Sequence, residues 1–138
     1  MLERLWNVGI KVPDLERELE FHRAGGNEIV LDEELTVDDE SYRLALVKMG
    51  DKYLHLGERM VYEAHLDAPL PYGPVHVIYI CDDFEADVER QIAAGATLFL
   101  GPLEATAGFG HRKVAFFRTP SGWILEIAKI YRHDVPEV

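Results

Sequence analysis

The sequence predicts an α+β domain in which two β-α-β-β-β modules pair to form one cup-shaped mixed sheet. Strand-like and helix-like segments follow one another in the same order twice along the chain. Residues that are equivalent in the two halves lie 69 to 71 positions apart, which indicates an internal duplication. The length of 138 residues and the composition, 48% hydrophobic and 28% charged, are those of an ordinary globular domain.

The first half begins with a strand and a short helix. Residues 5–12 alternate between apolar and polar side chains, which is the period of a half-buried strand. Asp14 is expected to cap a helix that carries Leu15 and Leu19 on one face and ends at Gly25. Three more strands are expected at residues 27–37, 42–49 and 52–57.

The second half repeats this order after a proline-rich segment. Residues 75–81 read as an apolar strand, Asp83 stands at the helix cap position, and Gly95 ends the helix. Three further strands are expected at residues 97–103, 113–118 and 123–130. The predicted organisation is a first module at residues 1–58, a linker at 59–74, a second module at 75–131 and a tail at 132–138.

The repeat assigns spatial equivalents to the polar residues of the strands. A shift of 69 positions aligns the beginnings of the halves, and a shift of 71 aligns their last strands, since hairpin loops absorb the difference. The equivalent pairs include Asn7 with His76, Asp14 with Asp83, Gly26 with Gly95, and His55 with Glu126.

Charge and targeting features exclude several classes of protein. The net charge of −11 opposes binding to nucleic acid and to anionic membranes. The first residues lack the basic and apolar regions of a signal peptide, and no apolar run is long enough to span a bilayer. The lone Cys81 cannot form an internal disulfide and is expected to be a buried core thiol. We therefore expect a cytoplasmic protein.

Four polar residues are expected on the concave face of the paired sheets. Trp6 and Val8 are assigned to the inward, helix-covered face, which leaves Asn7 on the open face, and the same alternation places His55, His76 and Glu126 there. Two imidazoles and a carboxylate, with a weak amide ligand from Asn7, suit a divalent metal ion such as Fe, Mn, Ni, Co or Zn. A lone strand histidine is more often structural, but His76 and Glu126 lie among apolar residues, where a polar group needs a partner.

Further residues are candidates for contact with a substrate. Arg112 could present a cation to an anionic substrate, although surface solvation is the ordinary role of such a residue. Tyr53 and Phe109 are aromatic residues available for a pocket, and the glycine-rich residues 105–110 are interpreted as a mobile loop over the site.

These motifs resemble the vicinal oxygen chelate superfamily, which includes glyoxalase I, methylmalonyl-CoA epimerase, extradiol dioxygenases and bleomycin-resistance proteins. The resemblance covers nearly the whole chain, from Asn-Val-Gly-Ile-Lys-Val-Pro-Asp-Leu at residues 7–15 to Thr-Pro-Ser-Gly-Trp-Ile-Leu-Glu at residues 119–126. It implies a metal held by the first and fourth strands of each module, which corresponds here to Asn7, His55, His76 and Glu126. The family's usual first ligand is His, Glu or Gln, so Asn7 is a departure from its pattern.

Three functions remain open at this point. The first is a glyoxalase-like metalloenzyme, an isomerase or lyase, that chelates neighbouring oxygens of a small substrate and moves a proton with Glu126 as the base. The second is a ring-cleaving or other dioxygenase with ferrous iron, and the third is a metal-free protein that binds or sequesters a small molecule. The unpaired strand edges of an incomplete barrel favour a homodimer.

Overall fold

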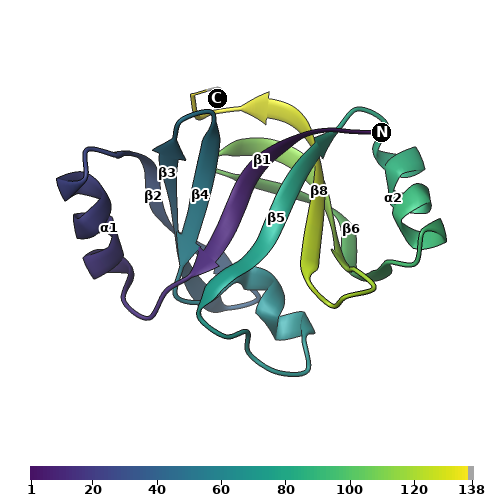
Figure 1. The fold of residues 1–138 in the computed structure, drawn as a ribbon, viewed down its shortest axis with the longest axis horizontal. Coiled ribbons are helices and arrows are strands. Elements are labelled where there is room, and N and C mark those ends of the chain that lie inside the picture. The colour runs from purple at the N-terminus through teal and green to yellow at the C-terminus, as the bar shows by residue number, and fades with distance from the viewer. Residues whose placement is uncertain (137–138) are drawn as a thin grey trace.

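One eight-stranded sheet runs through both halves of the chain in the order β2-β3-β4-β1-β5-β8-β7-β6 and curls into a half-barrel (Figure 1). The computed structural model describes residues 1–136. The strands are β1 Leu2–Lys11, β2 Glu28–Val37, β3 Glu40–Met49, β4 Lys52–Gly57, β5 Gly73–Cys81, β6 Thr97–Ala107, β7 Gly110–Arg118 and β8 Ile124–His133. The helices are α1 Leu15–Ala24 and α2 Phe84–Ala93, with a short 3-10 helix, η1, at Val61–His65.

The two halves meet within this chain at the antiparallel pair β1 and β5. β1 pairs in parallel with β4, and β5 pairs in parallel with β8, so each half repeats the same pairing. The duplication also appears in the register of the central strands. Gly9 of β1 lies between His55 of β4 and His76 of β5. Ile78 of β5 lies in the same way between Glu126 of β8 and Asn7 of β1. The predicted pair of modules in one mixed sheet is confirmed.

Both helices form where the sequence predicts them and cover the outer face of the sheet. The Asp14 carboxylate accepts the Arg17 backbone N–H at 3.1 Å, and Asp83 accepts that of Ala86 at 3.2 Å. The buried face of α1 packs on strands β1, β3 and β4, and that of α2 packs on β7 and β8. No helix within residues 1–136 is long and apolar enough to cross a membrane. With both helices outside, the concave side of the sheet is left for a cavity.

Trp6 lies on the opposite face from the one predicted. Its ring packs in the concave cluster with Tyr53 and Ile78, instead of facing the helix-covered side with Val8. The pairing of β1 with β5 shifts register between Leu5 and Asn7, and such an irregularity breaks the alternation of side chains along a strand. The prediction for Trp6 was wrong because it assumed an unbroken period of two.

The segment at 59–74 is packed into the fold more closely than its proline-rich composition indicates. Within it, η1 carries Glu63, whose carboxylate accepts a hydrogen bond from buried Lys11 at 2.9 Å. Lys11 also donates to the Leu70 carbonyl at 2.8 Å, and Glu63 accepts the Met60 backbone N–H at 3.0 Å. These bonds fix the connection between the two halves against the end of β1.

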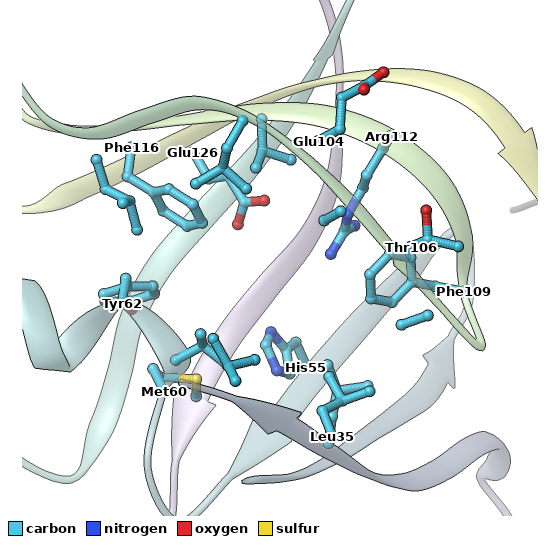
Figure 2. Close-up of a pocket in the computed structure, with 18 of the residues that line it drawn as sticks. Leu35, His55, Met60, Tyr62, Glu104, Thr106, Phe109, Arg112, Phe116 and Glu126 are labelled. Atoms are coloured by element: carbon cyan, nitrogen blue, oxygen red, sulfur yellow. The ribbon is translucent and has the colours of Figure 1, made fainter. Parts of the chain in front are cut away.

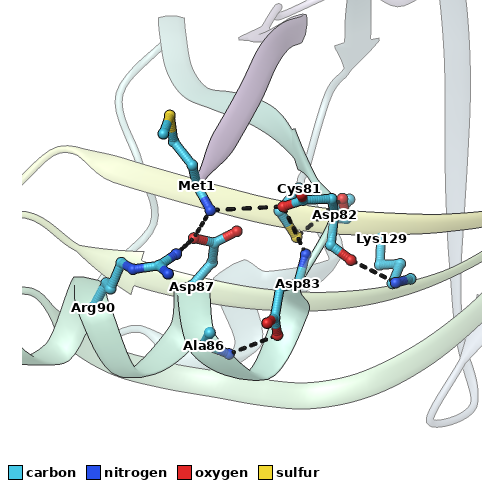
Figure 3. A network of polar contacts seen from close by, with 9 residues as sticks. Met1, Cys81, Asp82, Asp83, Ala86, Asp87, Arg90 and Lys129 are labelled. Carbon is cyan, nitrogen blue, oxygen red and sulfur yellow. Dashed lines mark hydrogen bonds and ion pairs between the residues drawn. The ribbon is translucent and has the colours of Figure 1, made fainter.

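A second buried carboxylate joins the start of β1 to α2 (Figure 3). Asp87 is 1% exposed, and its Oδ1 lies 2.7 Å from the Met1 amino group and 2.5 Å from the Arg90 guanidinium. Cys81 lies nearby and is a buried core thiol, as predicted, and its burial raises the pKa of the thiol to about 11. A thiol with this pKa is a poor nucleophile at neutral pH.

Candidate functional site

The concave side of the sheet encloses a cavity of about 530 Å³, and residues of the β2–β3 and β6–β7 hairpins are part of its lining (Figure 2). Its interior is largely apolar, and its rim carries the exposed carboxylates of Asp38 and Glu104. Five of the seven predicted site residues line it: His55, His76, Phe109, Arg112 and Glu126. His55 lies on β4 of the first half, and the other four lie in the second half, on β5, β7, β8 and the turn before β7. Both halves of the chain therefore contribute to one site.

His76 is fixed by one neighbour below its ring and another beside it. An added Cβ on Gly9 would lie 2.1 Å from His76 Cε1, so the ring rests directly on the glycine backbone. The Tyr62 hydroxyl lies 2.7 Å from His76 Nδ1, and the His55 ring centroid is 5.3 Å from that of His76. His76 Nε2 is buried and has no hydrogen-bond partner among residues 1–136. This nitrogen is available to a ligand or metal ion.

Both imidazoles are neutral at physiological pH. Burial is the main reason that the pKa of His55 falls to about 3, and the nearby Arg112 charge lowers it further. Burial likewise holds the pKa of His76 well below its ordinary value, with smaller contributions from His55 and Arg112. Each ring therefore keeps a lone pair on one nitrogen, which is the form that binds metal ions or accepts a proton.

Glu126 is a buried carboxyl group on the opposite wall from His55 (Figure 2). Its side chain is 3% exposed, and burial raises its pKa to about 7, although the positive charge of Arg112 acts in the other direction. A carboxyl group with this pKa exists in both protonation states near neutral pH. It can therefore take up and release a proton under the same conditions.

Arg112 projects into the same space between two aromatic rings. The guanidinium carbon lies 3.7 Å from the centroid of Phe109 and 5.2 Å from that of Trp6. The side chain is 7% exposed, and its Nε and Nη1 atoms have no hydrogen-bond partner in the described part of the chain. Burial lowers its pKa, and the carboxylate of Glu126 opposes that effect. A guanidinium nevertheless stays charged in proteins, so the cavity contains a fixed positive charge.

The structure places the other two predicted site residues outside the cavity lining. Tyr53 is fully buried in the concave cluster, its ring 5.7 Å from Trp6, and its hydroxyl donates a hydrogen bond to the Pro136 carbonyl. Asn7 is 1% exposed, and neither Oδ1 nor Nδ2 has a hydrogen-bond partner within residues 1–136. Tyr53 therefore bonds to the C-terminal segment, and Asn7 is buried but is not part of the cavity lining.

The donor chemistry of the site fits a divalent metal ion. Two neutral imidazoles, one with an unpartnered buried Nε2, and a nearby carboxylate are the donors that such ions prefer. Among the described residues, no three His, Cys, Asp or Glu side chains converge on one point. His55 and His76 would hold such an ion, and Glu126 is the carboxylate of the same cavity.

Two features of the cavity have no signal in the sequence pattern. Tyr62 lies in the proline-rich segment, where no periodicity assigns its side chain to a face. The glycine-rich stretch is a hairpin tip between β6 and β7, and the Gly108 backbone N–H donates to Glu33 Oε1 of β2 at 2.8 Å. This bond joins the two ends of the curled sheet across the cavity, a contact 75 residues apart in the chain.

The fold can be compared with those of known proteins. No protein-family model matches the chain, and no curated protein matches it by sequence. A variant of methylmalonyl-CoA epimerase from Streptomyces coelicolor, bound to 2-nitronate-propionyl-CoA, is similar over 96% of this chain and 100% of its own, with TM-score 0.73 and 23% identity.

Two further epimerase structures are similar to the same extent. A methylmalonyl-CoA epimerase in complex with methylmalonyl-CoA and NH4+ has a TM-score of 0.72 at 23% identity, over 99% of this chain and 100% of its own. The enzyme from Mycobacterium tuberculosis has a TM-score of 0.69 at 21% identity, over 95% of this chain and 90% of its own. At these identities the likeness is one of fold, and this chain has the fold of these epimerase structures.

Proposed function

We propose that this protein is an enzyme that moves a proton at a carbon next to a carbonyl group in a small oxygenated substrate, as an isomerase or lyase does. The observation that carries this proposal is the buried carboxyl group of Glu126, which faces His55 and His76 across one cavity. A substrate in that cavity would have a carboxylate on one side and two imidazoles on the other.

Glu126 is the proposed base. Asp38 and Glu104, the other carboxylates of the cavity lining, are exposed at its rim and remain solvated. Glu126 is buried, and a carboxylate removed from water takes up a proton more readily than one in water, even with the Arg112 charge acting in the other direction. It can abstract a proton from carbon and return it to a neighbouring atom of the substrate.

The imidazoles are the proposed holders of a divalent metal ion. When bound, the ion would polarise the substrate carbonyl and stabilise the enediolate formed by proton removal. With its lone pair on Nε2, His76 donates its Nδ1–H to the Tyr62 hydroxyl, which fixes the ring in the required orientation. His55 supplies the second nitrogen from the other half of the chain.

The apolar lining limits access of water to the reacting groups. Phe116 and Tyr62 pack against each other with ring centroids 5.2 Å apart, and Met60 and Leu35 line the same space. Charge interactions are stronger in such surroundings than in water. The similar folds of enzymes solved with methylmalonyl-CoA or 2-nitronate-propionyl-CoA support a carbonyl or thioester compound as the substrate.

The test is exchange of solvent deuterium into candidate carbonyl substrates, followed by NMR. We expect exchange with the wild-type protein and its loss in Glu126→Gln, which keeps the shape of the side chain. Glu104→Gln is the matched control, since Glu104 is exposed at the cavity rim. If Glu126→Gln retains full exchange, Glu126 is not the base.

Oxygen consumption by the wild-type protein without exchange would favour a ferrous dioxygenase instead. Tight ligand binding with neither exchange nor oxygen consumption, in protein loaded with each candidate metal, would favour a binding protein. Either result would overturn the proposed proton transfer.

A further inference from the structure

We propose that Arg112 binds a carboxylate group of the substrate, so that the cavity selects small organic acids over their neutral counterparts. The proton transfer on such acids rests on the function proposed above, but the binding of the carboxylate does not depend on it. The argument comes from the placement of one guanidinium group.

The guanidinium is held in place without being neutralised. Phe109 and Trp6 contact it through their rings, which orient the group. Ring contacts leave the N–H groups free, and Nε and Nη1 have no acceptor among the described residues. A buried charge with unpaired donors is costly, and its persistence at a fixed position indicates a partner that arrives from outside the chain.

Glu126 does not act as that partner. No hydrogen bond or ion pair joins Arg112 to Glu126 in the part of the chain that the structure describes, although both groups line the same cavity. Figure 2 shows the guanidinium projecting past Glu126 toward the space above His55. An anion bound there would neutralise the guanidinium and leave Glu126 facing another part of the same molecule.

The shape of the guanidinium and the charge of its surroundings favour a carboxylate as the anion. The planar guanidinium matches the two oxygens of a carboxylate, with which it forms paired charge-assisted hydrogen bonds. A phosphate group would bring nearly two negative charges beside Glu126, in a chain whose net charge is −11. One singly charged group therefore suits the single cation of this cavity better.

The geometry also relates the acid group to the reaction. Arg112 lies on β7 and Glu126 on the adjacent strand β8, where Phe116 pairs with Glu126 and Arg112 pairs with Ile130. A carboxylate held at Arg112 would leave the rest of a short substrate to extend toward Glu126 and His76. The substrate class that fits is a small acid with a carbonyl close to its carboxylate.

The experiment compares two probes of the same skeleton, acetoacetate and its uncharged methyl ester, by calorimetry and NMR titration. We expect the wild-type protein to bind acetoacetate about tenfold or more tightly than the ester. Arg112→Met should remove that preference and leave ester binding unchanged. Lys113→Met is the matched control, because Lys113 is the next residue on β7 and pairs with the exposed Glu85 at 2.5 Å instead of facing the cavity.

Arg112→Lys guards against a folding defect in the methionine variant, since it keeps a positive charge without the planar fork. We expect it to fold like the wild type and to retain only part of the preference for acetoacetate. Equal affinity of the wild-type protein for acid and ester overturns the proposal, and so does an unchanged preference in Arg112→Met. Inorganic phosphate that displaces acetoacetate at equal concentration would overturn the choice of a carboxylate.

The same titrations with Glu126→Gln separate this inference from the proposed reaction. If the acid binds through Arg112 in both proteins but the wild type catalyses no exchange, the proposed function fails and the carboxylate site stands. If acid and ester exchange at the same rate and bind equally, the proton transfer stands and the carboxylate site fails.

Discussion

His76 keeps its position because Gly9 has no side chain. In Gly9→Ala the new Cβ would come within 2.1 Å of the ring, so the imidazole must move away from Tyr62 and His55. We expect a loss of stability of about 1–3 kcal/mol and a shifted His76 ring signal by NMR. Gly25→Ala is the control, because Gly25 has a helical conformation and a Cβ added there would lie 3.4 Å from its nearest neighbour, the Phe21 carbonyl oxygen. An unshifted His76 signal in Gly9→Ala would contradict this account.

Glu126 makes the stability of the metal-free protein depend on pH. Because its pKa is raised from 4.5 to about 7 in the folded state, its contribution to stability is fully present below pH 4.5 and is lost as the pH rises through 7. Glu126→Gln removes this loss. We expect the variant, measured by urea unfolding with chelator present, to match the wild type near pH 4.5 and to exceed it by up to about 3 kcal/mol at pH 8.

The quantity to follow is the difference in free energy of unfolding between the wild type and Glu126→Gln. The histidines His55 and His76 change the stability of both proteins with pH, in the direction opposite to Glu126. Their pKa values are lowered on folding, so they favour the folded state above pH 6.5 and destabilise it as the pH falls. Both proteins contain these histidines, so their effect cancels. A difference that does not grow between pH 4.5 and 8 would contradict the raised pKa of Glu126.

Sequence reasoning placed His55, His76 and Glu126 at one cavity because two regularities agree there. Strand alternation puts each of them on the concave face, and the repeat makes the strand of His55 equivalent to that of Glu126 and the strand of His76 equivalent to that of Asn7. The orientation of Trp6 was missed because a register shift in β1 leaves no trace in the hydrophobic pattern. Tyr62 was missed because its segment has no period from which a face can be assigned.

Among the elements, η1 is secured to β1 by one buried ion pair. The side chains of Lys11 and Glu63 are 8% and 5% exposed, and removing one charge leaves the other buried without compensation. We expect Lys11→Met and Glu63→Leu each to lower the free energy of unfolding by about 3–5 kcal/mol, measured by chemical denaturation. The double variant should recover much of that loss; two single losses that simply add would contradict this prediction.

The caps of both helices were predictable, and the hairpin contact across the cavity was not. Asp14 and Asp83 act on residues three positions away, so the information is local to each segment. The bond between Gly108 and Glu33 depends on how far the sheet curls, which is a property of all eight strands together. Local pattern therefore predicted the two strands, but it interpreted residues 105–110 as a mobile loop, whereas they form the tip of the β6–β7 hairpin.

At the scale of the whole molecule, the sheet ends in two strands that each have one neighbour, β2 and β6. Edge strands present unpaired backbone groups, and proteins usually cover them. We propose that a second copy of this chain does so, and expect sedimentation equilibrium to give the mass of a dimer at micromolar concentration. A strict monomer across the concentration range would refute the homodimer.

The duplication made the order of strands and helices predictable. It did not predict whether the two modules pair within one chain or between two chains. A connecting segment of this length allows a module to pair with its own partner or with that of another chain. Only the three-dimensional arrangement decides, and β1 and β5 pair here within one chain. In this arrangement the bond between Lys11 and Glu63, 52 positions apart in the sequence, holds the 59–74 segment against β1.

The placement of the ionisable groups on opposite walls has a stereochemical consequence. Glu126 is the one buried carboxylate among the described cavity residues, so it can approach the substrate from a single face. A proton that Glu126 removes and returns stays on that face of the substrate. Deuterium placed at the reacting carbon of the substrate should then be partly retained in the product and not fully exchanged with solvent. Inversion at carbon would require a second proton donor on the other wall. The Tyr62 hydroxyl, which lies 2.7 Å from His76 Nδ1 in the same cavity and stays protonated because its pKa is raised, is the group we propose to test by Tyr62→Phe.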